Sequence, residues 1–225
     1  MSGWPWLVVT VLVYELLRRA YEARPRVYLV PVLGATVVLG AACLLLDVDL
    51  RVYASGTFPL GWLLGPATVA LAVPLVRERA LLLGHARAVG AGVVGGSIAS
   101  LVTAVLLARV LHLAPVLVRS VAPKSVTTPV AMPIAARLGG SPEITAAVVI
   151  ATGLFGMALG PTILSRAGVR SRLARGIGLG TAAHGIGTAA AMGESTVTGA
   201  AAAVAMVLAA VVTAIVAGPL LALLG

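Results

Sequence analysis

The chain has few charged and few aromatic residues. Charged side chains make up 10% of its 225 residues and aromatic side chains 4%, whereas hydrophobic residues make up 60%. Soluble domains carry about 25% charged residues. With a mean hydropathy of +1.09, this chain lies far outside that class. The scarcity of charge therefore argues against a soluble globular protein and predicts an integral membrane protein.

The chain is also poor in cysteine, and it lacks the pattern of a cleavable signal peptide. Its single cysteine, Cys43, cannot form an intrachain disulfide. No positive residue precedes the first apolar run, and Arg18 and Arg19 follow it, which is the reverse of a signal peptide. We therefore expect Trp4–Leu17 to remain as a helix that enters from outside the cell.

Most of the positive charge lies in three short segments between apolar runs. The net charge is +9, and such segments mark cytoplasmic loops of membrane proteins rather than a nucleic-acid surface. We expect a multi-pass protein of the cell inner (cytoplasmic) membrane with its N-terminus outside and with no nucleic-acid partner. The clusters are Arg18, Arg19, Arg24 and Arg26, then Arg77, Arg79 and Arg87, then Arg166, Arg170, Arg172 and Arg175.

Six apolar stretches approach the roughly 20 residues that cross a bilayer. No stretch shows the alternation of a membrane β-strand, so the predicted fold class is all-α. We expect a helical bundle with about six full transmembrane helices, forming a single polytopic domain over residues 1–225. The stretches are Trp4–Leu17, Val27–Leu46, Leu60–Val76, Ala88–Leu113, Ile144–Leu164 and Val197–Leu224.

Two further segments, Ala122–Leu138 and Gly176–Gly193, are too rich in glycine, proline and hydroxyl groups for ordinary spanning helices. We predict that both are re-entrant or broken elements, and that the first dips in and returns to the outer side. Whether the second crosses or returns stays open. An echo between "GPATVALAVPLV" and "APKSVTTPVAMPI" suggests an internal repeat, a common feature of transporters. The residues assigned to the breaks are Pro66, Pro74, Pro133, Gly180, Gly185 and Gly187.

The first broken segment, "APKSVTTPVAMP", has the composition of an anion site. Pro129 suits the first turn of a half-helix, whose free N–H groups and positive dipole end attract an anion. A kinked helix whose Lys124 reaches the membrane surface is an equally open alternative. The predicted substrate-binding residues here are Lys124, Ser125, Thr127, Thr128 and Pro129.

The second segment places the other predicted substrate-binding residues, Thr181, His184 and Thr188, on one helical face. An ionisable residue at membrane depth predicts a functional role, here as a substrate ligand or a proton carrier. A neutral histidine that bonds to a neighbouring helix is the alternative. Glu194 is a second candidate for proton coupling, or simply a loop carboxylate.

Nothing in the chain predicts catalysis. Lys124 and Ser125 are adjacent, so their side chains would diverge in a helix or a strand. There is no Gly-x-Ser-x-Gly elbow and no His-Glu-x-x-His metal pair. We therefore expect no enzymatic activity, no metal site and no cofactor.

Three ordered motifs, "PKSVTTPVAM", "LGGSPEITA" and "GTAAHGIGTA", resemble the signature segments of LrgB/CidB membrane proteins. The resemblance extends over nearly the whole chain. It implies one of two functions: transport of small monocarboxylates such as pyruvate, glycolate or glycerate, as in a plant plastidial relative, or holin/antiholin-like modulation of murein hydrolase export and autolysis. It also implies a small LrgA/CidA-type membrane partner.

The residues favour the first function, because a pore does not need a midplane cluster of lysine, hydroxyl groups and histidine. We expect a secondary transporter of a small carboxylate, with coupling to protons through His184 as one option, in contact with membrane lipid and assembled as a homo-oligomer such as a dimer.

Overall fold

The computed structural model describes residues 3–24, 30–63, 66, 69–70 and 72–224. The sequence was expected to form one domain, and the structure divides it into two compact units, Met1–Leu71 and Ala72–Gly225. The regular elements in the described residues are all helices, which confirms the predicted fold class.

The first unit contains α1 (Trp4–Ala23), α2 (Pro31–Leu45) and α3 (Leu50–Trp62). α1 packs against both of the others, and the ring of Trp6 meets Tyr53 edge to face at 5.7 Å between centroids. α1 continues past the predicted end at Leu17, because Glu15 bonds Arg18 and Arg19 one turn later on an exposed face. The arginines that were expected to follow the first helix therefore belong to it.

The predicted span Leu60–Val76 is wrong in its N-terminal part. α3 begins at Leu50 and ends at Trp62, and the next described helix, α5 (Ala72–Arg77), is short. The side chain of Asp49 accepts a hydrogen bond from the Arg51 amide and so starts the helix ten residues before the apolar run. Hydropathy alone does not register such a cap. The six predicted spans are not confirmed.

The second unit is built around three helices that are long and apolar enough to cross a membrane: α7 (Ala86–Val110), α10 (Pro142–Arg166) and α12 (Thr196–Leu223). Their bounds follow the three predicted spans closely. Serine caps fix two of the starts, because Ser141 and Ser195 accept bonds from amides three residues on. Short α6 (Arg79–Gly84) precedes α7, and its Leu82 packs on the start of α12.

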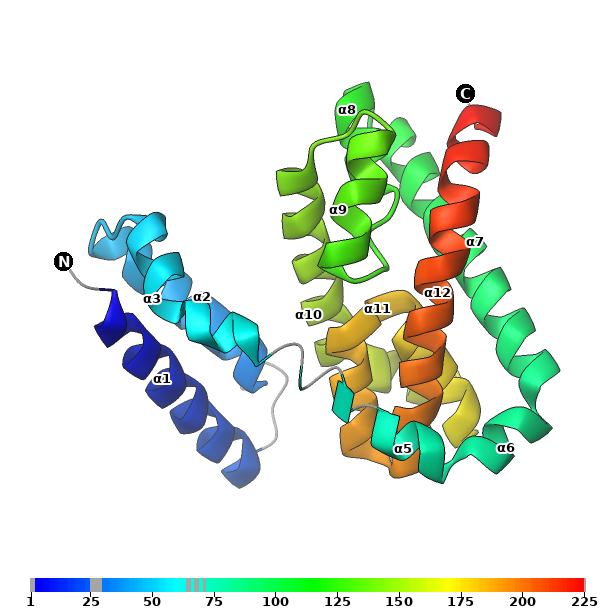
Figure 1. Cartoon of the computed structure of the whole chain (residues 1–225), viewed down its shortest axis with the longest axis horizontal. Helices are drawn as coiled ribbons and strands as arrows, with labels where there is room; N and C mark the ends of the chain where they lie inside the picture. The colour runs from blue at the N-terminus through cyan, green and yellow to red at the C-terminus, as the bar shows by residue number, and fades with distance from the viewer. Residues whose placement is uncertain (1–2, 25–29, 64–65, 67–68, 71, 225) are drawn as a thin grey trace. The chain divides into compact units, whose positions relative to one another are not determined.

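Two helical hairpins lie between these three helices. In the first, α8 (Pro115–Val121) leads into a turn, and α9 (Thr128–Arg137) returns toward the same end of the bundle (Figure 1). The Ser141 amide donates to the Ser120 hydroxyl at 2.8 Å, so the two ends of the hairpin are held together. The predicted element Ala122–Leu138 therefore contains only the turn and the second limb, α9. The first limb, α8, lies in a segment that was expected to be a loop.

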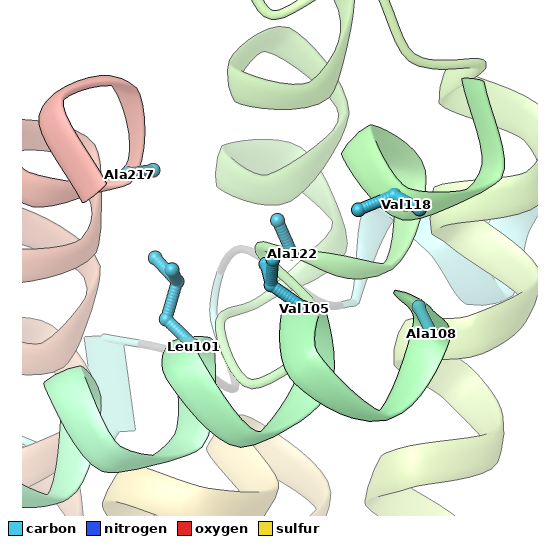
Figure 2. Close-up of a cluster of buried hydrophobic side chains, with 6 residues drawn as sticks. All are labelled: Leu101, Val105, Ala108, Val118, Ala122 and Ala217. Atoms are coloured by element: carbon cyan, nitrogen blue, oxygen red, sulfur yellow. The ribbon is translucent and has the colours of Figure 1, made fainter. Parts of the chain in front are cut away.

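The first limb is fixed by an apolar cluster rather than by its own length. Figure 2 shows Val118 and Ala122 lying over the face of α7 that carries Leu101 and Val105, with Ala217 of α12 beside them. Isolated helices of seven residues are unstable in water, so packing must hold α8 in place.

The second hairpin is α11 (Arg172–Glu194), which turns back at its middle (Figure 1). Ala183 and His184 have non-helical backbone angles, and His184 has a φ of 44°. Arg175 in the first turn bonds Glu194 at the other end at 2.6 Å. A straight helix would separate residues 19 apart by about 28 Å. The question left open by the sequence is thus answered by the fold: this segment returns.

Candidate functional site

The turns of the two hairpins meet inside the second unit. A Cβ built at Gly185, just past the bend of α11, would lie 4.0 Å from the methyl group of Thr127 in the first turn. Val149 of α10 touches both turns: its side chain packs on Val126, and its carbonyl accepts a bond from His184. Because the hairpins start from opposite ends of the bundle, this meeting point lies near its middle (Figure 1).

Two half-helices begin at this meeting point. α9 starts at Thr128, and the second limb of α11 starts after His184. The amides of Thr127 and Thr128 have no backbone partner among the described residues, and Pro129 has no amide hydrogen. Helix starts carry partial positive charge, so both ends favour an anion.

Lys124 lies half-buried in the first turn, among hydroxyl groups. Its Nζ donates to Ser125 Oγ at 3.1 Å and to Ser100 Oγ of α7 at 3.2 Å. The two serine oxygens are 2.6 Å apart. The side chains of Lys124 and Ser125 were expected to diverge, and this is wrong, because the residues form a turn rather than a helix or strand. The expectation that the chain is no enzyme stays a prediction.

His184 is buried in the bend of α11. A carbonyl can only accept, so its Nε2 donates to the Val149 oxygen at 3.0 Å and carries the ring hydrogen. The Thr188 hydroxyl in turn donates to the His184 carbonyl at 2.9 Å. This bond to a neighbouring helix is the contact that the second alternative above describes, and a role of His184 as substrate ligand or proton carrier stays a prediction.

Thr181, the third residue on this face of α11, is in a different environment. Its hydroxyl is buried, and no described residue bonds to it. The same holds for Ser97, one turn before Ser100 on α7. Thr181 and α7 touch at Gly96, where a Cβ would lie 3.1 Å from the threonine methyl. Two unpartnered hydroxyls thus lie inside the second unit, that of Thr181 where α11 touches α7 and that of Ser97 on α7, and a polar ligand or water could bond to them.

The first limb of α11 approaches α12 and α10 closely because one residue at each contact is a glycine, on α11 itself or on α10. A Cβ at Gly180 would overlap the backbone of Ala202 on α12, and a Cβ at Gly156 of α10 would overlap Ala183. A Cβ at Gly153 would lie 2.7 Å from the His184 ring. These glycines let a polar hairpin pack deep inside the bundle.

Glu194 does not lie with the other predicted residues. Both of its oxygens bond the Arg175 guanidinium, at 2.6 and 2.7 Å, at the open end of the α11 hairpin. The same arginine donates to the carbonyls of Pro161 and Val169 on the α10 side. Glu194 therefore ties the hairpin's ends together, about 15 Å of helix from His184.

Sequence comparison agrees with these motifs. The LrgB-like family matches residues 10–223. The chain belongs to this family. The resemblance noted from the three motifs is therefore confirmed.

Several curated relatives cover nearly the whole of this LrgB-like protein. YwbG of Bacillus subtilis is 40% identical over 92% of both chains, and YxaC of the same organism is 37% identical over 83% of this chain and 81% of its own. A third B. subtilis relative, named antiholin-like protein LrgB, is 31% identical over 96% of this chain and 94% of its own. No solved structure matches the chain.

Most of the residues predicted to break helices do not lie at a break in this LrgB-like protein. Pro133 does not break a helix, because α9 runs from Thr128 to Arg137 with Pro133 inside it. Gly180 and Gly187 lie within the two limbs of α11, and Gly185 lies beside the bend. Pro74 lies in α5, but several neighbours of Pro66 and Pro74 lie outside the described residues. The internal repeat therefore stays a prediction.

Ser100 and Ser97 were not among the residues predicted from the sequence. Both lie on α7, which hydropathy marks only as a spanning helix. A usable signal was present: the two serines are three residues apart, so they share one face of an otherwise apolar helix. Polar residues on such a face point to a buried partner.

Proposed function

We propose that this protein is a secondary transporter of small monocarboxylates of the pyruvate, glycolate and glycerate class. The observation that carries the proposal is the meeting of two hairpin turns around Lys124. Half-helix starts and a lysine amine match one carboxylate group. The hydroxyls of Thr128 and Thr181 can bond the 2-oxo or 2-hydroxy oxygen of such an acid, with His184 holding the bend of α11 in place.

The hairpins also suit alternating access. They start from opposite ends of the bundle, so each closes the path to one side of the meeting point. A shift of one hairpin against α7, α10 and α12 would open that side only. Such movements around a fixed midplane site are the usual way in which secondary transporters work.

The arginines support an orientation in the cytoplasmic membrane. The end of the second unit where α11 opens carries more of them than the opposite end, which has Arg109, Arg119 and Arg137. The richer end belongs in the cytoplasm by the positive-inside rule. In that orientation the α8–α9 hairpin lies outside, and the outside N-terminus, which belongs to the first unit, stays a prediction. The richer end holds Arg77, Arg79, Arg87, Arg166, Arg170, Arg172 and Arg175.

An antiholin-like role is the second candidate, and the comparisons support it more directly. A relative 31% identical to this protein carries the name antiholin-like protein LrgB. In that role the protein would form homo-oligomers, or pair with a small LrgA/CidA-type membrane protein, and influence murein hydrolase export. The buried polar cluster at the hairpin turns has no evident purpose in such a role.

One reconstitution experiment separates the two candidates. Purified protein in liposomes is given radiolabelled pyruvate or glycolate outside and a trapped fluorescent dye inside. Saturable uptake of the acid without dye loss supports transport, and Lys124→Ala should lower the uptake at least about tenfold because it removes the charged ligand. Arg137→Ala, at an exposed position on the same hairpin, is the matched control and should transport normally. Dye leakage without saturable uptake would support the antiholin-like role instead.

A further inference from the structure

Lys124 lies half-buried in the second unit, and no acidic side chain of the described residues pairs with it. Its Nζ donates to the hydroxyls of Ser100 and Ser125. The acidic side chains of the second unit lie at the ends of its helices or already have a hydrogen-bond partner. Glu78 precedes α6, Glu143 bonds the Ser141 hydroxyl, and Glu194 bonds Arg175.

The packed elements offer Lys124 little other charge. α7 presents serines and carries its arginines, Arg87 and Arg109, near its ends, and α10 and α12 carry no charged residue between their ends. α8 and α9 carry one arginine each, Arg119 and Arg137. α11 brings His184, whose ring is near enough for the charge of Lys124 to act on it. That ring is held by Val149 with its hydrogen on Nε2. The lysine is therefore the polar group at this point whose charge lacks a partner.

An ammonium ion away from water is costly unless an opposite charge accompanies it. A bound carboxylate supplies that charge. Binding of the anion and protonation of the amine then stabilise each other, and each must raise the affinity for the other by the same factor.

We propose that Lys124 takes up a proton when the carboxylate binds and carries it across with the substrate. The proposal rests on the transport function above. The neutral amine gains one proton to become ammonium, the substrate stays an anion, and the loaded site has no net charge. On the other side the carboxylate leaves, the amine returns its proton to water, and the cycle repeats. No covalent bond to the substrate forms.

This assignment differs from the one made from sequence, in which His184 and Glu194 were the proton carriers. The Nε2 hydrogen of His184 holds the bend of α11 to α10, so losing or moving it would disturb the hairpin. Glu194 is occupied by Arg175 at the hairpin's open end. Lys124 is free of both restrictions.

The first test measures protons at the binding step, on the purified full-length protein with pyruvate. Titration calorimetry in buffers of different ionisation enthalpy reports how many protons are taken up per pyruvate bound. Wild type should take up a proton, and its dissociation constant should rise with pH, by up to about tenfold per unit. Lys124→Arg keeps a permanent positive charge and should bind pyruvate without uptake, whereas His184→Gln should still take up a proton. Binding by wild type without proton uptake would overturn the proposal, whether or not either variant folds.

The second test measures coupling in liposomes. When the medium outside the liposomes is more acidic than the lumen, wild type should accumulate pyruvate. A membrane potential set by potassium and valinomycin should not change the amount of pyruvate accumulated. Lys124→Arg should exchange labelled for unlabelled pyruvate, which also shows that it is folded, but should not accumulate it. Arg137→Lys is the matched control and should behave as wild type.

The outcomes separate this proposal from the proposed function. If wild type neither binds nor moves a carboxylate, both are overturned. If wild type transports and Lys124→Arg accumulates pyruvate equally well down the same pH gradient, the transport function stands and the role of Lys124 is wrong.

Discussion

At the scale of single residues, Arg175 shows how one side chain can hold a fold. Its guanidinium bonds both oxygens of Glu194 and two carbonyls near the end of α10, and the side chains of the ion pair are only 14% and 23% exposed. An ion pair in which a guanidinium binds a carboxylate with two parallel hydrogen bonds is stronger than a typical surface ion pair. It therefore fixes the open end of the α11 hairpin.

We predict that Arg175→Gln lowers the free energy of unfolding by about 1–3 kcal/mol, because the Glu194 carboxylate loses its partner. The measurement is thermal unfolding in detergent. Arg170→Gln, at an exposed position in the same arginine cluster, is the control and should change little. A double-mutant cycle with Glu194→Gln should show that the two effects are not additive; additive effects would mean that the pair does not hold the hairpin.

His184 is a second residue whose backbone conformation is determined by its neighbours and not by its residue type. A φ of 44° is uncommon for a non-glycine residue and is strained by about 1–3 kcal/mol. The bond to Val149 and the close fit against Gly153 hold the residue there. Such strain is typical of sites at which the backbone must turn for functional reasons.

At the scale of elements, glycine decides how close the limbs of the hairpins come to the bundle. Gly180 of α11 lies against the Ala202 backbone, whereas a Cβ at Gly95 of α7 would meet nothing within 4 Å. The two glycines are indistinguishable by composition, since both lie in apolar, small-residue helices. Only the packing tells them apart.

This contrast gives a paired prediction. Gly180→Ala should destabilise the protein by about 1–3 kcal/mol through overpacking. Gly95→Ala should be neutral or stabilise it by up to about 1 kcal/mol, since alanine favours helix. Both are read from thermal unfolding of the purified protein. Equal effects of the two substitutions would show that α11 does not pack on α12 as described.

At the scale of the whole molecule, the returning hairpins predict an unusual accessibility pattern. Arg119 lies in α8, on the first limb of the first hairpin, and Arg137 ends its second limb, whereas Arg172 and Thr196 lie at the two ends of the second hairpin; all four are exposed. Because each hairpin returns, both flanks of one hairpin belong on the same side of the membrane. In a simple alternation of spanning helices, they would lie on opposite sides.

The test uses single cysteines in a Cys43→Ala background and a membrane-impermeant maleimide on whole cells. We expect Arg119→Cys and Arg137→Cys to be labelled, and Arg172→Cys and Thr196→Cys to be labelled only after the cells are broken. Opposite labelling within either pair would contradict the hairpin. Reversal of all four positions would leave the hairpins intact and reverse only the proposed orientation.

The sequence by itself determined the class of fold, the three long helices of the second unit, the two interrupted segments and the family. These depend on local quantities: hydropathy over about 20 residues, serine caps, and the glycine and proline that weaken a helix. Composition could also mark Lys124 and His184, because a polar residue is rare in such a chain.

Only the tertiary structure decided that α11 returns, that α8 is a hairpin limb, and that Ser100 joins Lys124. It also separated Glu194 from His184, although the two are close in sequence. The physical reason is that each of these depends on contacts between residues distant in the chain: Arg175 with Glu194, Val118 with Leu101, and Lys124 with Ser100. The pattern of residues along one segment does not contain its partners, and here the partners decide which way the chain turns.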